Sequence, residues 1–187
     1  MTTDPSLRPP RESALIVAVP EVEGLVGPFR ARHDPAAAEG VPAHVTVLYP
    51  FLPPQKITPQ VERTLSELFA ALPEFRASFT EVRCFPEALY LAPEPAKSFR
   101  QLTELVFARF PETPPYEGRF ADVVPHLTVA HAAEPASFDA IATELGRAAK
   151  GRLPIRADVR EIVMIEKMNG RWRARMSFLL KGAGTKP

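Results

Sequence analysis

The 187-residue chain contains one cysteine and one tryptophan, and it has no long run of apolar residues. The single cysteine, Cys84, cannot form a disulfide within the chain, so we expect a reducing compartment and a cytoplasmic protein. The longest apolar stretch, 14–20, has the length of a strand and is far too short to span a membrane. The first residues also lack the cationic start and apolar core of a signal peptide. We therefore expect no association with a membrane.

A strong charge of either sign is also missing, because the formal net charge is only +1. This balance argues against a broad basic face that holds long duplex DNA, but it permits a locally basic cleft for a small anion. The hydrophobic content of 45% and the charged content of 24% are ordinary for a globular protein. A chain of this length buries roughly 70% of the surface that it exposes when unfolded. We expect one domain, or two small lobes with a common core, and a monomer.

Proline is abundant, with 22 residues, and it mainly marks the boundaries of secondary-structure elements. Several prolines lie in the first twelve residues, and we expect 1–12 and 183–187 to be disordered tails. The segment between them, 13–182, is expected to fold as a single bilobal domain. Neither tail contains a pattern that indicates chemistry.

One tetrapeptide occurs twice, as His-Val-Thr-Val at 44–47 and as His-Leu-Thr-Val at 126–129. Both copies have the composition of a short strand, and a proline precedes each by one or two residues. Side chains alternate along a strand, so the His and Thr of each copy share one face, ~6.7 Å apart, while the apolar pair points into a core. Two such strands side by side would aim two imidazoles and two hydroxyls at one small anion.

The order of the expected elements indicates an internal duplication. Strand, helical segment, motif strand, helix and strand are expected at 13–19, 21–32, 44–51, 58–72 and 75–85, and again at 88–92, 98–110, 126–132, 138–150 and 153–167. A last strand at 171–181 follows a turn at Asn169-Gly170. Any α+β chain with short strands can be paired in this way, but a real duplication would place two lobes across a pseudo-two-fold axis with the motif strands in the groove between them.

The paired motif, 82 positions apart, resembles the two-histidine (2H) phosphoesterase superfamily, in particular its 2′-5′ RNA ligase-like and cyclic phosphodiesterase branch. The resemblance spans about 13–181, including Trp172 in the last strand. It implies an α+β, bilobal and duplicated fold, in which two antiparallel-rich sheets form a central groove and helices pack outside. It also implies metal-independent phosphodiester chemistry with no cofactor. Many members carry an arginine a few residues after the second motif histidine, where this chain has Ala130-His131.

The motif residues also suit this chemistry on physical grounds. Opening a 2′,3′-cyclic phosphate needs a base for the nucleophile and an acid for the leaving oxygen, on opposite sides of phosphorus. An imidazole has an ordinary pKa near 6.5, so near neutral pH one can be neutral and the other protonated. We expect His44 and His126 to be the acid and base, in an order that the sequence does not determine. Thr46 and Thr128 would donate hydrogen bonds to phosphate oxygens.

Several residues beside the motifs are weaker candidates. Tyr116, Arg119 and Phe120 lie in a loop before the second motif, where an aromatic ring could stack on a base and Arg119 could contact phosphate. We expect His131 to face away from the groove unless a β-bulge redirects it. Two aromatic residues, Tyr49 and Phe51, share the parity of the buried valines and are expected in the core. For Trp172 we expect packing rather than ligand contact.

A metal site is the main alternative to acid–base catalysis, and the spacing argues against it. His126 and His131 differ by five positions, so an uninterrupted strand places them on opposite faces. The sequence also has no His-x-x-x-His pattern and no second cysteine. We therefore expect no metal.

Three classes of function remain open. The favoured class is a metal-independent phosphodiesterase or 2′-5′ RNA ligase-like enzyme that acts on 2′,3′-cyclic or 2′-5′-linked ends of a nucleotide or short RNA. The second is a nucleotide- or RNA-binding protein without turnover, and the third is an interaction domain with incidental histidines. The natural substrate and the direction of the reaction are not readable from the sequence.

Overall fold

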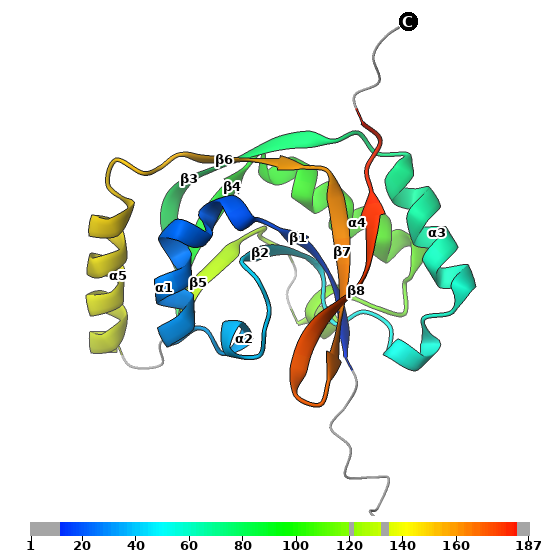
Figure 1. Ribbon diagram of the computed structural model, residues 1–187, viewed down its shortest axis with the longest axis horizontal. Coiled ribbons are helices and arrows are strands. Elements are labelled where there is room, and N and C mark those ends of the chain that lie inside the picture. Colours follow the sequence, from blue (N-terminus) through cyan, green and yellow to red (C-terminus); the bar gives the residue numbers. More distant parts are fainter. Residues whose placement is uncertain (1–11, 120–121, 132–134, 183–187) are drawn as a thin grey trace, which may run out of the picture.

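A computed structural model describes residues 12–119, 122–131 and 135–182, with only the backbone described for 135–137 (Figure 1). The strands are β1 (Ser13–Ala18), β2 (His44–Leu48), β3 (Phe75–Phe85), β4 (Ala88–Glu94), β5 (Leu127–His131), β6 (Ile155–Val159), β7 (Glu161–Met168) and β8 (Arg171–Leu179). The α-helices are α1 (Glu23–His33), α2 (Pro35–Ala38), α3 (Pro59–Ala70), α4 (Ala96–Arg109) and α5 (Pro135–Ala149). Three short 3₁₀ helices are η2 (Pro20–Val22), η3 (Pro54–Lys56) and η4 (Pro115–Gly118).

The strands form two four-stranded sheets in which every neighbouring pair is antiparallel. The first sheet has the order β2-β1-β7-β8 and the second has the order β5-β4-β3-β6. Each motif strand is therefore an edge strand, paired with the strand that opens its half of the chain. The expected α+β fold with two antiparallel sheets is confirmed.

The expected duplication is present, but each half of the chain contributes one strand to the sheet of the other half. β3, from the first half of the chain, lies in the second sheet beside β4, and β7, from the second half, lies in the first sheet beside β1. Each sheet is therefore built from both halves. The two lobes cannot be separated by cutting the chain at its midpoint.

The single strand expected at 153–167 is wrong, because the segment forms two strands, β6 in the second sheet and β7 in the first. Exposed and buried residues alternate up to Val159, and then Arg160 and Glu161 are both exposed. Two successive exposed polar residues interrupt the period of two that a continuous strand requires. At this point the chain crosses from one sheet to the other.

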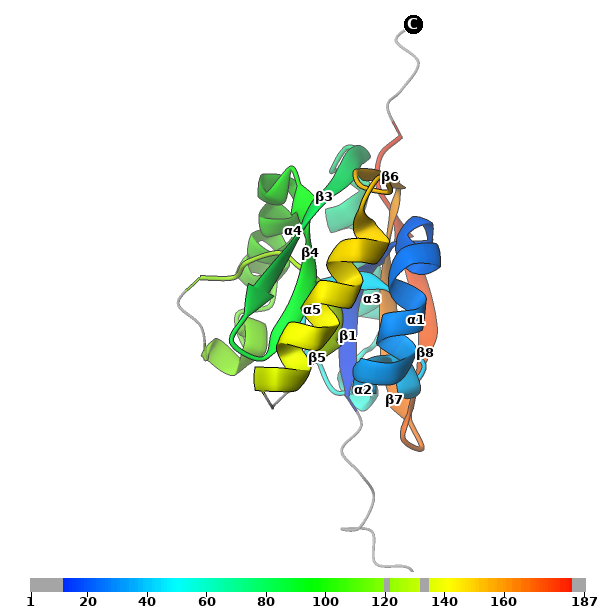
Figure 2. The same ribbon diagram turned by 90° about the vertical axis from the view of Figure 1, so that its left-hand side faces the viewer.

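The helices lie outside the sheets and share one hydrophobic core with them. α1 and α5 are neighbours on one flank, and α3 and α4 are neighbours on the other (Figures 1 and 2). α3 lies within the helix expected at 58–72, with Pro59 at its first position and the Thr58 hydroxyl accepting a hydrogen bond from the Val61 amide. The core cluster joins the two motif strands, since Val45, Val47, Leu127 and Val129 all belong to it.

Two further segments are the connection before β2 and the turn between β7 and β8. The segment between α1 and β2 contains the short helix α2, whose first turn is capped by the Asp34 side chain. The expected turn between β7 and β8 is confirmed, with positive φ angles of 51° at Asn169 and 77° at Gly170. Of the expected tails, only Glu12 lies within the described residues. No helix in the described part of the chain has the length and apolar character needed to cross a membrane.

A buried hydroxyl connects α4 to the first motif strand. The Thr103 hydroxyl, 5% exposed as a residue, donates a hydrogen bond of 2.7 Å to the Val47 carbonyl oxygen. The register between β1 and β2 shifts at this point, with Leu15 opposite Leu48 and Ile16 opposite Thr46, so Val47 is the extra residue of a β-bulge. The side chain of Thr103 thus satisfies a backbone acceptor at the irregular position of the ladder.

We expect Thr103→Val to lower the free energy of unfolding by about 1–3 kcal/mol, because the substitution keeps the shape but leaves the buried Val47 carbonyl without its donor. Urea denaturation followed by circular dichroism measures this change. Thr64→Val is the matched control, since this buried hydroxyl lies 3.5 Å from the Gln60 amide nitrogen, and it should cost less than about 0.5 kcal/mol. Equal losses in the two variants would contradict the role of the Thr103 hydrogen bond.

Candidate active site

The motif strands β2 and β5 are the edges of the two sheets, and these edges contact each other. The expected alternation holds in both, because the histidines and threonines are half-buried and the apolar residues between them are buried. β5 begins one residue later than expected, so His126 immediately precedes it. The contact between the edges brings four predicted site residues to one region: His44, Thr46, His126 and Thr128.

Both imidazoles are anchored in the same way. His44 Nδ1 lies 2.8 Å from the carbonyl oxygen of Pro42, and His126 Nδ1 lies 2.8 Å from the carbonyl oxygen of Val124. A carbonyl oxygen only accepts hydrogen bonds, so Nδ1 carries the proton in each ring. Each neutral imidazole then keeps the lone pair on Nε2. The carbonyl two residues earlier fixes both the tautomer and the orientation of the ring.

Burial dominates the electrostatics of both rings. It lowers the pKa of His44 to about 4, and the positive charges of Arg30 and His126 act in the same direction, while the hydrogen bond to Pro42 opposes them. Burial also lowers the pKa of His126, with a contribution from His131, against the hydrogen bond to Val124. Both imidazoles are therefore neutral near pH 7 in the free protein. The contact between β2 and β5 brings the two rings to the same region.

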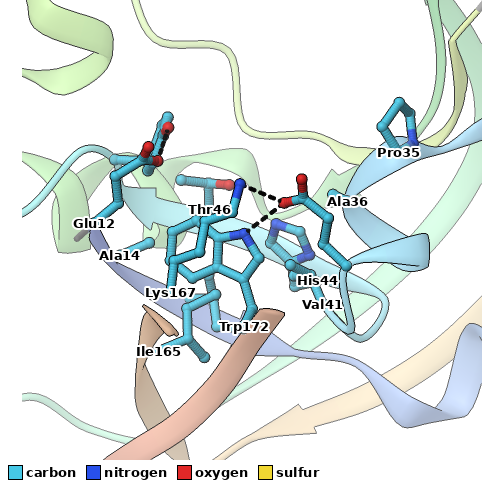
Figure 3. Close-up of a pocket in the computed structure, with 13 residues that line it drawn as sticks. Glu12, Ala14, Pro35, Ala36, Val41, His44, Thr46, Ile165, Lys167 and Trp172 are labelled. Atoms are coloured by element: carbon cyan, nitrogen blue, oxygen red, sulfur yellow. Dashed lines mark hydrogen bonds and ion pairs between the residues drawn. The ribbon is translucent and has the colours of Figure 1, made fainter. Parts of the chain in front are cut away.

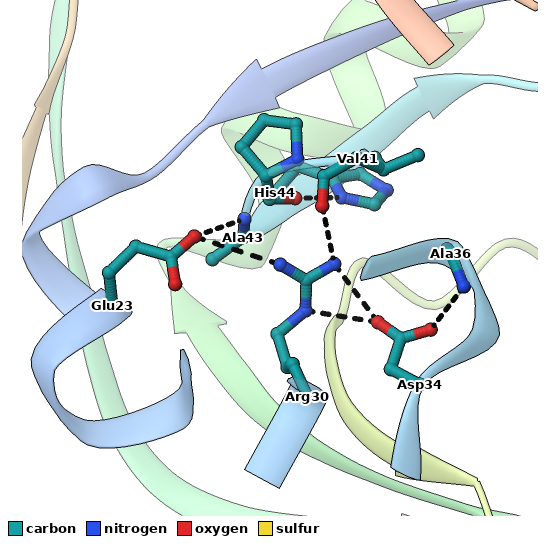
Figure 4. Close-up of polar contacts among 8 residues, drawn as sticks. Glu23, Arg30, Asp34, Ala36, Val41, Ala43 and His44 are labelled. Carbon is teal, nitrogen blue, oxygen red and sulfur yellow. Dashed lines mark hydrogen bonds and ion pairs between the residues drawn. The ribbon is translucent and has the colours of Figure 1, made fainter. Parts of the chain in front are cut away.

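A buried ion pair supports the segment that carries His44 (Figure 4). The Arg30 guanidinium, 3% exposed, contacts the Asp34 carboxylate at 2.9 Å and donates to the Val41 carbonyl at 3.0 Å. The Glu23 carboxylate lies 3.7 Å from Arg30 and accepts from the Ala43 amide at 2.7 Å. The residues on both sides of Pro42 are thus held by charged side chains. These contacts fix the position of the carbonyl to which His44 is hydrogen-bonded.

His126 has a different environment, made of aromatic rings. The Phe85 ring lies 5.1 Å from the imidazole and the Tyr90 ring 5.7 Å, measured between centroids, and both meet it edge to face. Phe85 and Tyr90 also stack on each other, with centroids 4.4 Å apart. The two site histidines are therefore related by the duplication but have unequal surroundings, a cation behind one and aromatic rings beside the other.

The prediction that Tyr49 lies in the core is wrong. The bulge at Val47 places Val47 and Leu48 both in the core, so the next residue returns to the face of Thr46. Tyr49 is half-buried there, and its hydroxyl donates a hydrogen bond of 2.6 Å to Glu12. Burial and this hydrogen bond raise the pKa of Tyr49 to about 12. Phe51, the other aromatic residue predicted for the core, is buried as expected.

A bulge at the corresponding position of β5 redirects His131. Leu89 is opposite Ala130 while Tyr90 is opposite Thr128, so one residue of β5 is again extra. The bulge reverses the parity, and the exposed His131 returns to the side of Thr128, near enough to lower the pKa of His126. We expected the His131 ring to face away from the groove unless a β-bulge redirected it, and β5 contains such a bulge. Tyr49 and His131 occupy equivalent positions in the two halves.

A pocket of about 270 Å³ opens beside the first motif (Figure 3). His44 and Thr46 line it together with Tyr49, Lys167 and Trp172. The Lys167 ammonium and the Trp172 indole N–H converge on the Glu39 carboxylate, at 2.8 and 3.1 Å. Lys167 lowers the pKa of Glu39, so this carboxyl is ionised. Trp172, which we expected only to pack, forms part of the wall of the pocket.

The loop before the second motif reaches the first one. The Tyr116 amide donates a hydrogen bond of 2.6 Å to the Tyr49 carbonyl, and the Tyr116 hydroxyl is hydrogen-bonded to Thr46. Burial raises the pKa of Tyr116, and the hydrogen bond with Thr46 acts in the opposite direction. Tyr116 and Glu117 both have left-handed backbone angles, with φ values of 50° and 58°. Tyr116 is thus brought to the site. Arg119, by contrast, is exposed and forms an ion pair with Glu117, and Phe120 lies outside the described residues.

Sequence reasoning missed several side chains of the pocket, for different reasons. The Asn169-Gly170 turn fixes the register of β7 and β8 and so places Lys167 opposite Trp172. Because this turn was expected, the pairing of Lys167 with Trp172 could have been predicted from the sequence. Glu39 lies in a distant segment whose contact with Trp172 exists only in the folded chain. The sequence placed Glu12 in a tail, but its carbonyl accepts a hydrogen bond from the Lys167 amide. No sequence signal indicated these last two residues.

The arrangement has the parts that acid–base chemistry on a phosphate requires. Two imidazoles with free Nε2 atoms lie beside two half-buried hydroxyls, on adjoining strands fixed by one core. Among the residues that the structure describes, no three His, Cys, Asp or Glu side chains are grouped as metal ligands would be. The side chains can exchange protons and donate hydrogen bonds to an anion.

The chain is similar to several solved structures over most of its length. It is 20% identical to TT0787 of Thermus thermophilus, with a TM-score of 0.65, and the match covers 92% of this chain and all of that one. E. coli LigT complexed with 3′-AMP is 17% identical, with a TM-score of 0.58 and coverage of 92% and 99%. LigT complexed with NADP⁺ is 18% identical, with a TM-score of 0.57 and coverage of 93% and 99%. These structures share the fold.

A comparison with curated protein sequences gives no significant match. The family model of the 2′-5′ RNA ligase superfamily, however, matches residues 18–171, which is most of the chain and includes both motifs. This match and the shared fold confirm the resemblance seen in the two tetrapeptides. The chain belongs to the 2′-5′ RNA ligase superfamily, among the 2H phosphoesterases.

Proposed function

We propose that the protein is a metal-independent phosphodiesterase or 2′-5′ RNA ligase-like enzyme that acts on 2′,3′-cyclic or 2′-5′-linked ends of nucleotides or short RNA. The observation that carries this proposal is the pair of identically anchored imidazoles on adjoining strands, each with Nε2 left free by the hydrogen bond at Nδ1. His44 and His126 act as general acid and base. Superfamily membership supports the class of reaction.

In the hydrolytic direction, one neutral imidazole takes a proton from water while the water oxygen forms its bond to phosphorus. The other imidazole, protonated, gives its Nε2 proton to the ribose oxygen as the cyclic P–O bond breaks. The reaction exchanges the protonation states of the two rings and yields a phosphomonoester. In strand joining a 5′-hydroxyl takes the place of water and the two groups keep their roles, whereas in the reverse direction they exchange them.

The hydroxyls of Thr46 and Thr128 donate hydrogen bonds to the non-bridging phosphate oxygens, where the transition state holds its charge. Tyr116 is hydrogen-bonded to Thr46, which orients that hydroxyl. We assign His131 to the same phosphate, because the bulge of β5 directs it to the side of Thr128. Arg119 is paired with Glu117, so it contacts substrate only if this ion pair opens.

The substrate we propose is a nucleotide or a short RNA end. Structural neighbours support a nucleotide ligand, since LigT has been solved with 3′-AMP, with NADP⁺ and with ATP. The small net charge supports a short ligand rather than a long duplex. We expect a monomer to be active, because both motifs come from one chain.

We expect His44→Ala and His126→Ala each to lower kcat for hydrolysis of nucleoside 2′,3′-cyclic phosphates by about 10²–10⁴-fold, since each removes one proton-transfer group. Thr46→Val and Thr128→Val should each lower kcat by about 10²-fold through loss of a hydrogen-bond donor. The assay measures product formation from cyclic nucleotides and the cleavage of short 2′-5′-linked oligonucleotides. Full activity in either histidine variant would exclude the acid–base pair.

His33→Ala is the matched control, because His33 is a half-buried histidine at the end of α1 and lies outside the site. It should keep the activity of the unsubstituted protein. Thermal unfolding of all variants checks that the losses do not come from unfolding. If the unsubstituted protein binds cyclic nucleotides without forming product, the proposal fails in favour of a nucleotide-binding protein.

The pH dependence follows from the lowered pKa values. Catalysis needs one ring protonated and the other neutral, and kcat/KM reports the ionisation of the free enzyme. We expect kcat/KM to follow a bell-shaped profile against pH. The acid limb lies near pH 4, where His44 becomes protonated. The basic limb lies below pH 6.5, because the remaining proton is lost as pH rises through the lowered pKa of His126. The prediction holds whichever ring is the acid. A maximum of kcat/KM above pH 7 would contradict it.

The stability of the fold should change in the same range of pH. Unfolded histidines bind protons below pH 6.5, whereas the folded rings resist them, so the free energy of unfolding falls as pH drops from 6.5 towards 4. Activity measured at pH 6 after incubation at each pH separates this loss from the catalytic profile.

Because the proposed chemistry uses only side chains, activity should be unchanged in excess chelator. The test compares initial rates with and without EDTA after dialysis against the chelator. A loss of activity that one divalent ion restores would overturn the metal-independent mechanism.

A further inference from the structure

The pocket beside His44 extends away from the catalytic groups. His44 and Thr46 line it from β2, and the rest of the wall comes mainly from β1, the segment around α2, and the hairpin of β7 and β8 (Figure 3). A group attached to a phosphate held between the two motifs can enter it directly. The chemistry of the lining therefore determines which substituent of the phosphate it accepts.

The floor of the pocket is apolar and its sides are aromatic. Ala14, Ile16, Val41 and Ile165 form a small hydrophobic cluster separate from the main core, and all four line the pocket. Tyr49 and Trp172 pack against this cluster and meet edge to face, with centroids 6.1 Å apart. An apolar floor with half-buried aromatic walls suits a flat ring.

The polar atoms of the pocket are mainly acceptors. Two carboxylates line it, with Glu12 accepting from the Tyr49 hydroxyl and Glu39 accepting from Lys167 and Trp172. With His44 neutral near pH 7, Lys167 is the only cationic side chain among the described residues of the lining, and Glu39 already neutralises it. A second phosphate would meet more negative than positive charge here. A neutral ring with N–H donors would meet carboxylate oxygens.

We propose that this pocket is a subsite for the nucleobase of the substrate, and that it selects bases with an exocyclic amine over bases that present only a carbonyl at that edge. The inference rests on the proposed function for its link to a phosphate between the motifs. Further phosphate groups of a larger substrate then lie on the open side of the groove, away from Glu12 and Glu39. The specificity of the enzyme is set on the side of His44.

Trp172 provides a direct test, because it is the only tryptophan of the chain. Cytidine 3′-phosphate should quench its fluorescence in a saturable manner, whereas glycerol 3-phosphate, which lacks the base, should not. Uridine 3′-phosphate should bind about tenfold more weakly than the cytidine compound, since a carbonyl replaces the amine. Glu39→Gln should reduce this preference, because the amide can donate to the uracil carbonyl.

Kinetics supply the second measurement. The ratio of kcat/KM for cytidine 2′,3′-cyclic phosphate to that for glycerol 1,2-cyclic phosphate should fall about tenfold or more in Trp172→Leu, and less in Trp172→Phe, which keeps a ring. Phe107→Leu, a change of a partly exposed aromatic residue outside the pocket, should leave the ratio unchanged.

The two measurements separate the two proposals. Base-dependent quenching without turnover of any cyclic phosphate or 2′-5′-linked oligonucleotide would support the subsite and overturn the proposed enzymatic function. Turnover without base-dependent quenching, or a ratio that Trp172→Leu leaves unchanged, would overturn the subsite alone. Equal affinity for the cytidine and uridine compounds would overturn the selection by the two carboxylates.

Discussion

Each motif strand has to bury one face in a common core and present the other to the groove, and the register of β2 and β5 meets both requirements. The valines and leucine between the site residues pack into one cluster that spans the two sheets. Because these strands are the contacting edges, the core that stabilises the fold also sets the separation of the two motif strands. A slip of one residue in either strand would turn its histidine into the core and its valine into the groove.

The duplication supplies two equivalent walls, and the neighbouring residues make them unequal. Both imidazoles have the same backbone anchor, but Arg30 lies behind the segment that carries His44 while Phe85 and Tyr90 border His126. A buried guanidinium is costly unless it is paired, and here the Asp34 and Glu23 carboxylates and the Val41 carbonyl satisfy it. Its hydrogen bond to the Val41 carbonyl also supports the segment that anchors His44.

Particular residues show which parts of the site could be predicted from the sequence. The alternation of the tetrapeptides was sufficient to place His44 and His126 on their faces, because that property is local to a strand. The position of Tyr49 was not accessible, since the bulge that turns it depends on how β2 pairs with β1. Arg30 and Asp34 have the spacing of a helical ion pair, but only the folded chain shows that they are buried.

The lowered pKa values give substrate binding a chemical role of its own. In the free protein both rings are neutral near pH 7, so neither can yet act as the acid. A bound phosphate brings a negative charge into the same partly desolvated region, and an opposite charge at short range favours the protonated form of an imidazole. Binding of the anion therefore promotes uptake of the proton that the reaction needs. For the acid–base pair that we propose, substrate binding would then supply the protonated ring, a consequence of the burial of both rings beside the core that positions them.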